Sequence, residues 1–185
     1  MSNKKKFKDI VQADLYRYNG TKGWWNCLKT YCKKRDFRLV FLYRLFQSGH
    51  VHALAWWLLR RIASRANIEI GWHAQIGKGL VIVHGGCIAI NNEVKMGDNC
   101  TLYHGVTIGM EFRGKRQGNP TIGNKVWVGP NATIVGDVTV GDDVLIAPNT
   151  FVNFDVPSHS IVLGNPGKIM HRENATEAYI IRTVS

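Results

Sequence analysis

The segment that decides the fold spans residues 122–156 and reads IGNKVWVGPNATIVGDVTVGDDVLIAPNTFVNFDV. An aliphatic residue opens each group of six, and a small or aliphatic residue follows four places later. The openers are Ile122, Val128, Ile134, Val140, Ile146 and Val152. Neither a helix, with about 3.6 residues per turn, nor a strand, which alternates at every second residue, produces this period. A period of six predicts a parallel β-helix, in which three hexads close one triangular coil.

The same period continues upstream, with two interruptions. Its earlier openers are Ile70, Ile76, Ile90, Met96, Leu102 and Ile108. The first interruption contains Val83-His84-Gly85-Gly86, and the second is the polar, glycine-rich segment 109–120. Insertions in solenoids usually gather on one face, which is often the binding face. We therefore expect both interruptions to serve function, and the second to leave the coil as a loop.

Composition limits the partners. The formal net charge of +11 and the pI near 9.7 favour an anionic partner. Nucleic acid, a nucleotide cofactor with phosphates and an anionic membrane surface all fit this charge. The four cysteines show no CxxC spacing, and Cys100 falls on an inward position, so we expect free thiols in a reducing cytosol. Residues 1–8 are polar and basic, which predicts no secretory signal and a cytoplasmic protein, free or bound to a membrane surface.

Residues 1–66 are predicted to be helical, because apolar residues recur at helical spacing in 9–18 and 37–65. The expected buried side comprises Leu39, Tyr43, Leu45, Phe46, Leu54, Trp57, Leu58 and Ile62. The expected solvated side carries Arg38, Arg44, Arg60, Arg61 and Arg65. We interpret this region as a cap on the open end of the solenoid. The alternative is an interfacial helix in which residues 56–61 touch a membrane.

The predicted organisation has three parts. A helical region covers residues 1–66, and a β-helix covers 67–158 with its excursion loop at 109–121. An exit turn and a tail form residues 159–185. The longest apolar run, residues 53–59, is too short to cross a bilayer.

Several motifs in this order resemble a known family. They are His84-Gly85-Gly86, the stretch YHGVTIG at 103–109, the long loop and Gly164-Asn165-Pro166. Together they resemble the serine O-acetyltransferase branch of the hexapeptide-repeat acyltransferases, and are most similar to capsular or exopolysaccharide O-acetyltransferases of the colanic-acid type. The resemblance covers roughly residues 68–168. It implies a mainly β protein, a left-handed parallel β-helix with an N-terminal α-helical region. It also implies acetyl-CoA as co-substrate without a metal, and a homotrimer or a pair of trimers with active sites between subunits.

The resemblance also assigns catalytic roles. His84 matches the family's general base, a role that suits a side chain titrating near neutral pH. Glu69, fifteen residues earlier, stands where the family carries an aspartate that orients the imidazole. The backbone N–H groups of Gly109 and Met110 match the donors to the developing oxyanion.

For acetyl-CoA, the resemblance points to the coils after the loop. Gly129, Pro130, Ala147 and Pro148 stand where family members contact the pantetheine arm, although small residues there also serve tight coil packing. Lys168 is expected near the nucleotide phosphates. Trp127 either covers the solenoid surface or flanks the pantetheine arm.

The expected acceptor depends on two departures from the serine pattern. Val83 replaces an aspartate before the catalytic histidine, and Gly118-Asn119 replace an Arg-His pair before Pro120. Without these charges a zwitterionic amino acid has no evident counter-charges. We therefore expect a neutral sugar hydroxyl, in surface polysaccharide synthesis, with L-serine as the alternative. Acceptor contacts are expected at Val83, Asn119 and His104, although His104 is equally explained as a structural corner residue. The loop cations either meet an acidic saccharide or are solvated; they are Arg113, Lys115 and Arg116.

Two other classes of function are disfavoured. A zinc enzyme on the same solenoid needs several histidines that converge on a metal, and the spacing around His84 and His104 does not supply them. A non-catalytic scaffold or a nucleic-acid binder explains the charge but not the histidine and loop motifs. The chain also lacks the aromatic stacking pattern of such binders. We therefore expect neither a metal nor nucleic acid.

Overall fold

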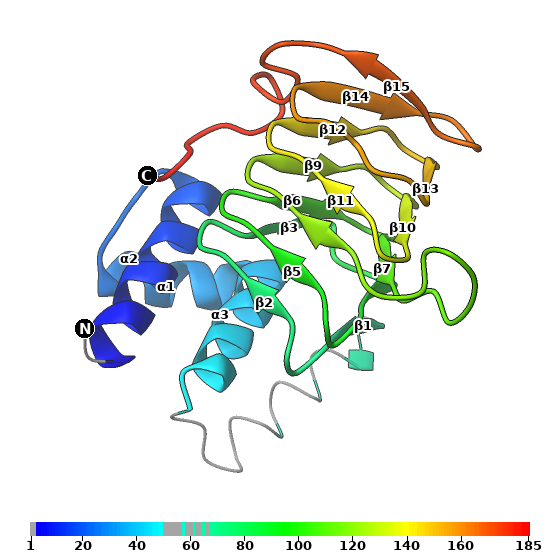
Figure 1. Cartoon of the computed structure of the whole chain (residues 1–185). Helices are drawn as coiled ribbons and strands as arrows, with labels where there is room; N and C mark the ends of the chain where they lie inside the picture. The colour runs from blue at the N-terminus through cyan, green and yellow to red at the C-terminus, as the bar shows by residue number, and fades with distance from the viewer. Residues whose placement is uncertain (1–2, 50–56, 58–60, 62–63, 66) are drawn as a thin grey trace.

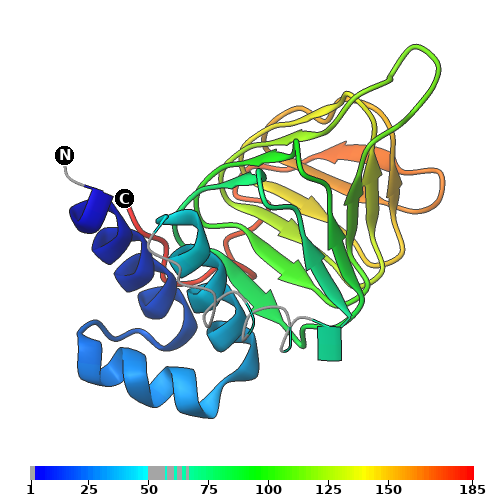
Figure 2. The same cartoon turned by 90° about the horizontal axis from the view of Figure 1, so that it is seen from below.

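A computed structural model describes residues 3–49, 57, 61, 64–65 and 67–185. Three parallel sheets form the sides of a triangular prism (Figures 1 and 2). Sheet A contains β1 (Ile68–Ile70), β4 (Ile88–Ile90), β7 (Thr107–Gly109), β10 (Thr133–Val135) and β13 (Phe151–Val152). Sheet B contains β2 (Gln75–Ile76), β5 (Lys95–Met96), β8 (Thr121–Ile122) and β11 (Thr139–Val140). Sheet C contains β3 (Val81–Val83), β6 (Thr101–Tyr103), β9 (Val126–Val128), β12 (Val144–Ile146), β14 (Ser160–Leu163) and the antiparallel β15 (Lys168–His171).

The hexad residues stack in register along each side. Ile90 pairs with Ile108 in sheet A, and Val128 pairs with Ile146 in sheet C. Every predicted opener except Ile70, which is half-buried, has a buried side chain. The interior is therefore one continuous aliphatic column, and the predicted mainly β class with a parallel β-helix is confirmed.

Sheet C continues past residue 158, where the sequence predicts the exit segment to begin. β14 pairs in parallel with β12, and Val162 is fully buried opposite Ile146. β15 then folds back on β14 as an antiparallel strand. The solenoid thus gains one more strand before the exit turn at Gly164.

Three helices cover the first coils: α1 (Asn3–Asn19), α2 (Trp24–Lys33) and α3 (Arg35–Gln47). Gly20 and Gly23 separate α1 from α2 with positive φ angles that glycine adopts without strain. α2 lies inside the predicted helical region, but outside the two segments in which helical spacing was seen. Leu39, Val40 and Tyr43 of α3 join the aliphatic core of the prism, so α3 closes the open end of the first coil.

Arg44 departs from the expected solvated side of α3. Its side chain is 2% exposed and forms an ion pair with Asp14 of α1 at 2.8 Å, with Asp14 equally buried. The guanidinium also donates to the carbonyl oxygens of Ile76 at 2.6 Å and Gly77 at 2.5 Å. Arg44 therefore connects α1 and α3 to the first coil through polar contacts. No coil precedes the first one, so its carbonyl oxygens at Ile76 and Gly77 accept hydrogen bonds from Arg44 instead.

The tail after β15 returns along the prism to the helices (Figure 1). Ala175 and Ile180 pack with Trp127 and Leu145 on the outer face of sheet C. At the far end, Val184 and Asn99 exchange two hydrogen bonds of 2.9 Å. The tail is thus a strap that connects the last coils to the first.

Part of the predicted helical region lies outside the described residues. This applies to Leu54, Leu58, Ile62 and Arg60, and to most of the segment 56–61 assigned as a membrane-contacting alternative. Trp57, which was expected on the buried side, is instead 49% exposed, and the Arg61 guanidinium lies 5.1 Å from the centre of its ring. Among the helices that the structure describes, none is long and apolar enough to span a membrane.

Candidate active site

His84 lies at the edge where strands of sheet C end and strands of sheet A begin; we name it the histidine edge. The turn from β3 to β4 is two residues longer than in a regular hexad. The inward residues on either side of it, Ile82 and Ile90, are eight positions apart instead of six. His84 has a φ of 51° and is exposed. A Cβ on the next residue, Gly85, would lie 2.9 Å from Asp36 Oδ1. The Asp36 carboxylate of α3 therefore lies directly against this glycine.

The predicted acetyl-CoA contacts stack along this same edge. Val83 pairs with Tyr103, so His84 and His104 occupy equivalent places on consecutive coils. The backbone N–H of Asn131 donates to the carbonyl of His104 at 3.0 Å, and the backbone N–H of Asn149 donates to the carbonyl of Pro130 at 2.9 Å. Pro148 follows one coil later. The histidine edge thus brings together residues that are spread over more than sixty positions in the sequence.

The remaining predicted contacts continue this arrangement with different exposure. Gly129 is buried, and a Cβ there would lie 2.8 Å from the backbone nitrogen of Pro148, so coil packing alone requires this glycine. Ala147 is half-buried, with its N–H bonded to the carbonyl of Val162. Lys168 is exposed at the start of β15, opposite Leu163. An edge that ends at the exposed ammonium group of Lys168 fits a long ligand with terminal phosphates.

Glu69 lies on β1, opposite Ala89 of β4, and its side chain is exposed. Within the described part of the chain, no hydrogen bond or ion pair joins Glu69 to His84. Its role in orienting the imidazole therefore stays a prediction.

The excursion loop runs between β7, which ends at Gly109, and β8, which begins at Thr121, at another edge of the prism from His84 (Figure 2). Glu111 and Gly118 exchange two backbone hydrogen bonds of 3.0 Å, and Arg116 forms an ion pair with Asp155 at 3.2 Å. Asn119 Oδ1 is buried without a hydrogen-bond partner. The loop departs where sheet A strands end, whereas His84 lies where they begin. A single chain therefore does not bring Gly109, Met110 or Asn119 to its own His84.

A cavity of about 400 Å³ opens beside His84, between the helices, the outer face of sheet C and the tail. Its walls carry His84, Asp36, Arg35, Tyr103, Tyr179 and Arg182, together with Arg17, Tyr18, Lys34, Val81, Ile82, Val83, Thr101 and Ile181. The Tyr18 hydroxyl accepts from the N–H of Ile82 at 2.9 Å and donates to its carbonyl at 3.1 Å. Burial raises the pKa of this phenol, so it stays a neutral structural group.

Aromatic rings continue from His84 along the outer face of sheet C. Tyr103 lies 6.3 Å from His84 between ring centres, and Trp127 lies 5.0 Å from Tyr103. Tyr179 of the tail covers Trp127 at 5.0 Å, and Trp127 is only 6% exposed. Trp127 therefore covers the solenoid surface beneath the tail, and its burial leaves little ring surface for a pantetheine arm.

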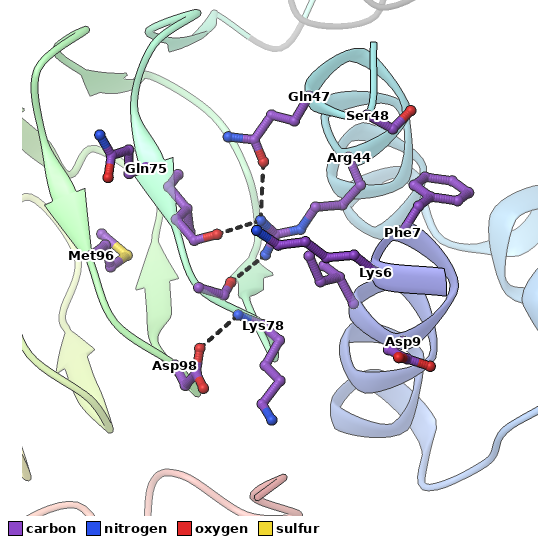
Figure 3. Close-up of a pocket in the computed structure, with 13 residues that line it drawn as sticks. Lys6, Phe7, Asp9, Arg44, Gln47, Ser48, Gln75, Lys78, Met96 and Asp98 are labelled. Atoms are coloured by element: carbon purple, nitrogen blue, oxygen red, sulfur yellow. Dashed lines mark hydrogen bonds between the residues drawn. The ribbon is translucent and has the colours of Figure 1, made fainter. Parts of the chain in front are cut away.

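A larger cavity of about 770 Å³ lies between α1, α3 and sheet B, and its walls do not include His84 (Figure 3). Lys6, Asp9, Lys78 and Asp98 line it, and Figure 3 shows Arg44 directed at the first coil with its donors already occupied. Its lining includes no histidine, so the cavity beside His84 is the better candidate site.

No group of three or more metal-binding side chains occurs among the described residues. The cysteines are free thiols: Cys27 and Cys100 are buried, and Cys32 and Cys87 are exposed. Burial raises the pKa of the Cys100 thiol to about 12, which makes it unreactive.

Comparison with known proteins defines the class. Residues 119–153 match the bacterial transferase hexapeptide family (six repeats). A serine acetyltransferase of Helicobacter pylori is 38% identical over 140 residues, which cover 72% of this chain and 80% of that protein. The chain therefore belongs to the hexapeptide-repeat acyltransferases and is an enzyme of that class.

Other relatives point to one branch of the family. Serine acetyltransferase 4 of Arabidopsis thaliana is 34% identical over 143 residues; these are 77% of this chain but 39% of that protein. A structure of the Neisseria gonorrhoeae serine acetyltransferase in complex with serine superposes with a TM-score of 0.70 at 27% identity, and covers 90% of this chain and 69% of that one. These matches support the serine acetyltransferase branch, and not the closer likeness to polysaccharide enzymes that the sequence predicted.

Proposed function

We propose that the protein transfers the acetyl group of acetyl-CoA to a hydroxyl group, with His84 as general base. The observation that carries this proposal is the histidine edge. There an exposed histidine borders a cavity and stands in line with the open edge that ends at Lys168. The relatives favour L-serine as the acceptor, which reverses the preference drawn from the sequence.

His84 would act twice in this reaction. Its free imidazole nitrogen accepts the proton of the acceptor hydroxyl while that oxygen attacks the thioester carbon. The imidazolium then donates this proton to the sulfur as the carbon–sulfur bond breaks. The negative charge that develops on the thioester oxygen needs a backbone donor. Gly109 and Met110 are the proposed donors, and Glu69 is the proposed orienting group.

These donors imply a site shared between copies of the chain. Gly109 and Met110 lie at the far edge of sheet A from their own His84, so a second copy must present its loop to complete the site. We propose a homotrimer for this reason, and a pair of trimers is the larger alternative. Sedimentation of the purified chain distinguishes them, and a purely monomeric active enzyme would contradict both.

A sugar hydroxyl remains the second candidate acceptor, on one specific observation. Val83, beside His84, is half-buried and apolar, and Gly118-Asn119 carry no charge in the loop. These positions therefore offer no counter-charge to the ends of an amino acid.

The test follows thiol release from acetyl-CoA with a thiol-reactive chromophore. L-serine, simple hexoses and nucleotide sugars are supplied in parallel, with an acceptor-free reaction as the control. We expect acceptor-dependent release with L-serine. Release with sugars alone would replace serine by the second candidate, and no acceptor-dependent release with any of them would overturn acetyl transfer to these acceptors.

A further inference from the structure

The helices supply the charges that the solenoid lacks beside His84. The sequence shows no counter-charges for an amino acid at Val83 or in the loop. The structure places the first two residues of α3, Arg35 and Asp36, against the glycine that follows His84. Both line the same cavity as His84.

Arg35 is held at the turn but keeps free donors. Its Nη2 donates to the carbonyl oxygen of Gly85 at 2.6 Å, which fixes the guanidinium one residue from His84. The side chain is 58% exposed. A guanidinium has five N–H donors in a planar fork that matches a carboxylate, so one bond to Gly85 leaves it able to bind another group.

Asp36 carries a half-buried carboxylate that has one distant ion-pair partner. Its side chain is 24% exposed, and its nearest cation is the neighbouring Arg35, with Nε 3.9 Å from Oδ1. In the described part of the chain no hydrogen bond to its carboxylate is found. A partly desolvated carboxylate without donors is costly, and an ammonium group would satisfy it.

Arg17, which also lines this cavity, is already occupied. Arg17 donates to the carbonyls of Gly79, Asn99 and Ile181 and to the hydroxyl of Thr101. Its guanidinium therefore fixes α1 and the tail to the first coils and is not available to a ligand. Lys34 donates to the carbonyl of Tyr18, and Arg182 lies beside Gly20. Arg35 and Asp36 are the pair of opposite charges that lies against Gly85, next to His84.

We propose that Asp36 and Arg35 bind the ammonium and carboxylate groups of an amino-acid acceptor and so hold its hydroxyl at His84. This inference rests on the proposed function and specifies its acceptor as a free amino acid such as L-serine. This assignment explains how the chain can resemble serine acetyltransferases although Val83 replaces the aspartate and Gly118-Asn119 replace the Arg-His pair. The counter-charges come from the helical cap instead of the solenoid turn and the loop. A neutral sugar does not require both signs of charge.

The test uses Asp36→Asn and Arg35→Gln, with Asp9→Asn and Arg172→Gln as matched controls outside this cavity. We expect the KM for L-serine to rise at least tenfold in both test variants, with the KM for acetyl-CoA unchanged and wild-type values in both controls. Arg35→Lys keeps a positive charge near Gly85. A KM for L-serine closer to the wild-type value in Arg35→Lys than in Arg35→Gln would show that the charge, and not only the contact with Gly85, binds the acceptor. Thermal unfolding of each variant shows whether it is folded.

Two serine analogues separate substrate binding from a structural role. L-serinamide lacks the carboxylate, so Arg35→Gln should leave its KM unchanged. N-acetyl-L-serine lacks the ammonium group, so Asp36→Asn should leave its KM unchanged. Equal losses for all three acceptors, or a shifted pH profile of kcat with an unchanged KM, would overturn the proposal in favour of a role in positioning His84.

Calorimetric titration of L-serine separates this inference from the proposed function. Binding that depends on Asp36 in a protein that releases no thiol would sustain the inference and overturn acetyl transfer. Thiol release with sugars alone, together with no binding of L-serine, would sustain acetyl transfer and overturn the inference.

Discussion

The regular coils from β8 to β13 and the first coils under the helices share one repeat but differ in their surroundings. In the regular coils, Val128, Ile134 and Ile146 point inward without exposure, and backbone ladders connect each coil to the next. In the first coils, the helices bring Arg44, Asp36 and Arg35 against the turns. The same β-helix is thus a scaffold in one region and one wall of a site in the other.

This difference shows why a periodic fold needs irregular additions to become an enzyme. A strict hexad fixes an aliphatic interior and short turns, which leave little room for charged groups near a reacting atom. The two extra residues around His84 and the helical cap provide that room. The repeat fixes where the site lies, and the departures from the repeat supply its functional side chains.

The largest effect on stability is expected where the two regions are joined. Arg44→Met removes the partner of buried Asp14 and two hydrogen bonds to the first coil. Leaving a buried charge unpaired costs about 3–5 kcal/mol of unfolding free energy. Urea unfolding should show this loss, and the double variant with Asp14→Leu should recover much of it because no unpaired charge remains. A loss below about 1 kcal/mol in Arg44→Met would mean that the cap docks without this pair.

The interior of the regular coils should respond through packing alone. Ile134 on β10 is fully buried, and Ile134→Ala leaves a cavity in the aliphatic column. We expect a loss of about 2–5 kcal/mol in unfolding free energy. The KM for the acceptor should stay at its wild-type value in the protein that remains folded. A changed acceptor KM would contradict the separation of scaffold and site.

A smaller and pH-dependent effect is expected at the strap. Burial alone would raise the pKa of the Asp143 carboxyl, but hydrogen bonds from Thr176, His159 and Ala175 together lower it below its usual value. Because the folded pKa is lowered, this stabilisation is present above the unfolded value of about 3.9 and is lost as the pH falls through the folded pKa. Asp143→Asn should cost about 1–3 kcal/mol at pH 7.

The difference between wild type and Asp143→Asn should shrink in urea unfolding at about pH 3. The exposed Asp137, exchanged for Asn, is the matched control. An equal difference at both pH values would show that the Asp143 charge does not hold the tail.

The periodic part of the fold could be predicted from the sequence, because each residue of the inner core between 122 and 156 is also a position of the six-residue pattern. The burial of Ile134 and Val140 could be predicted without knowing which distant residues they contact. The extra strand β14 was not predicted, because its coil is shorter than a regular one and Val162 falls out of phase. The burial of Arg44 was not predicted either, because its partner Asp14 lies thirty residues away on another helix.

The site could be predicted only in part, for a similar reason. His84 stands within a motif, and the stacking of Pro130 and Pro148 follows from the repeat. Arg35 and Asp36 lie about fifty residues before His84 in a charged stretch that reads as solvated, and no local pattern links them to the turn. Only the docking of α3 on Gly85 brings them beside His84.

The central claim is that the histidine edge performs acetyl transfer, and the most direct measurement is the turnover number of His84→Ala. Thiol release from acetyl-CoA would be followed with the preferred acceptor, with exposed His73→Ala as the matched control. A lost general base predicts a fall of about 10²–10⁴-fold in kcat, with an unchanged melting temperature and unchanged acetyl-CoA binding. His84→Ala with wild-type turnover would contradict the account.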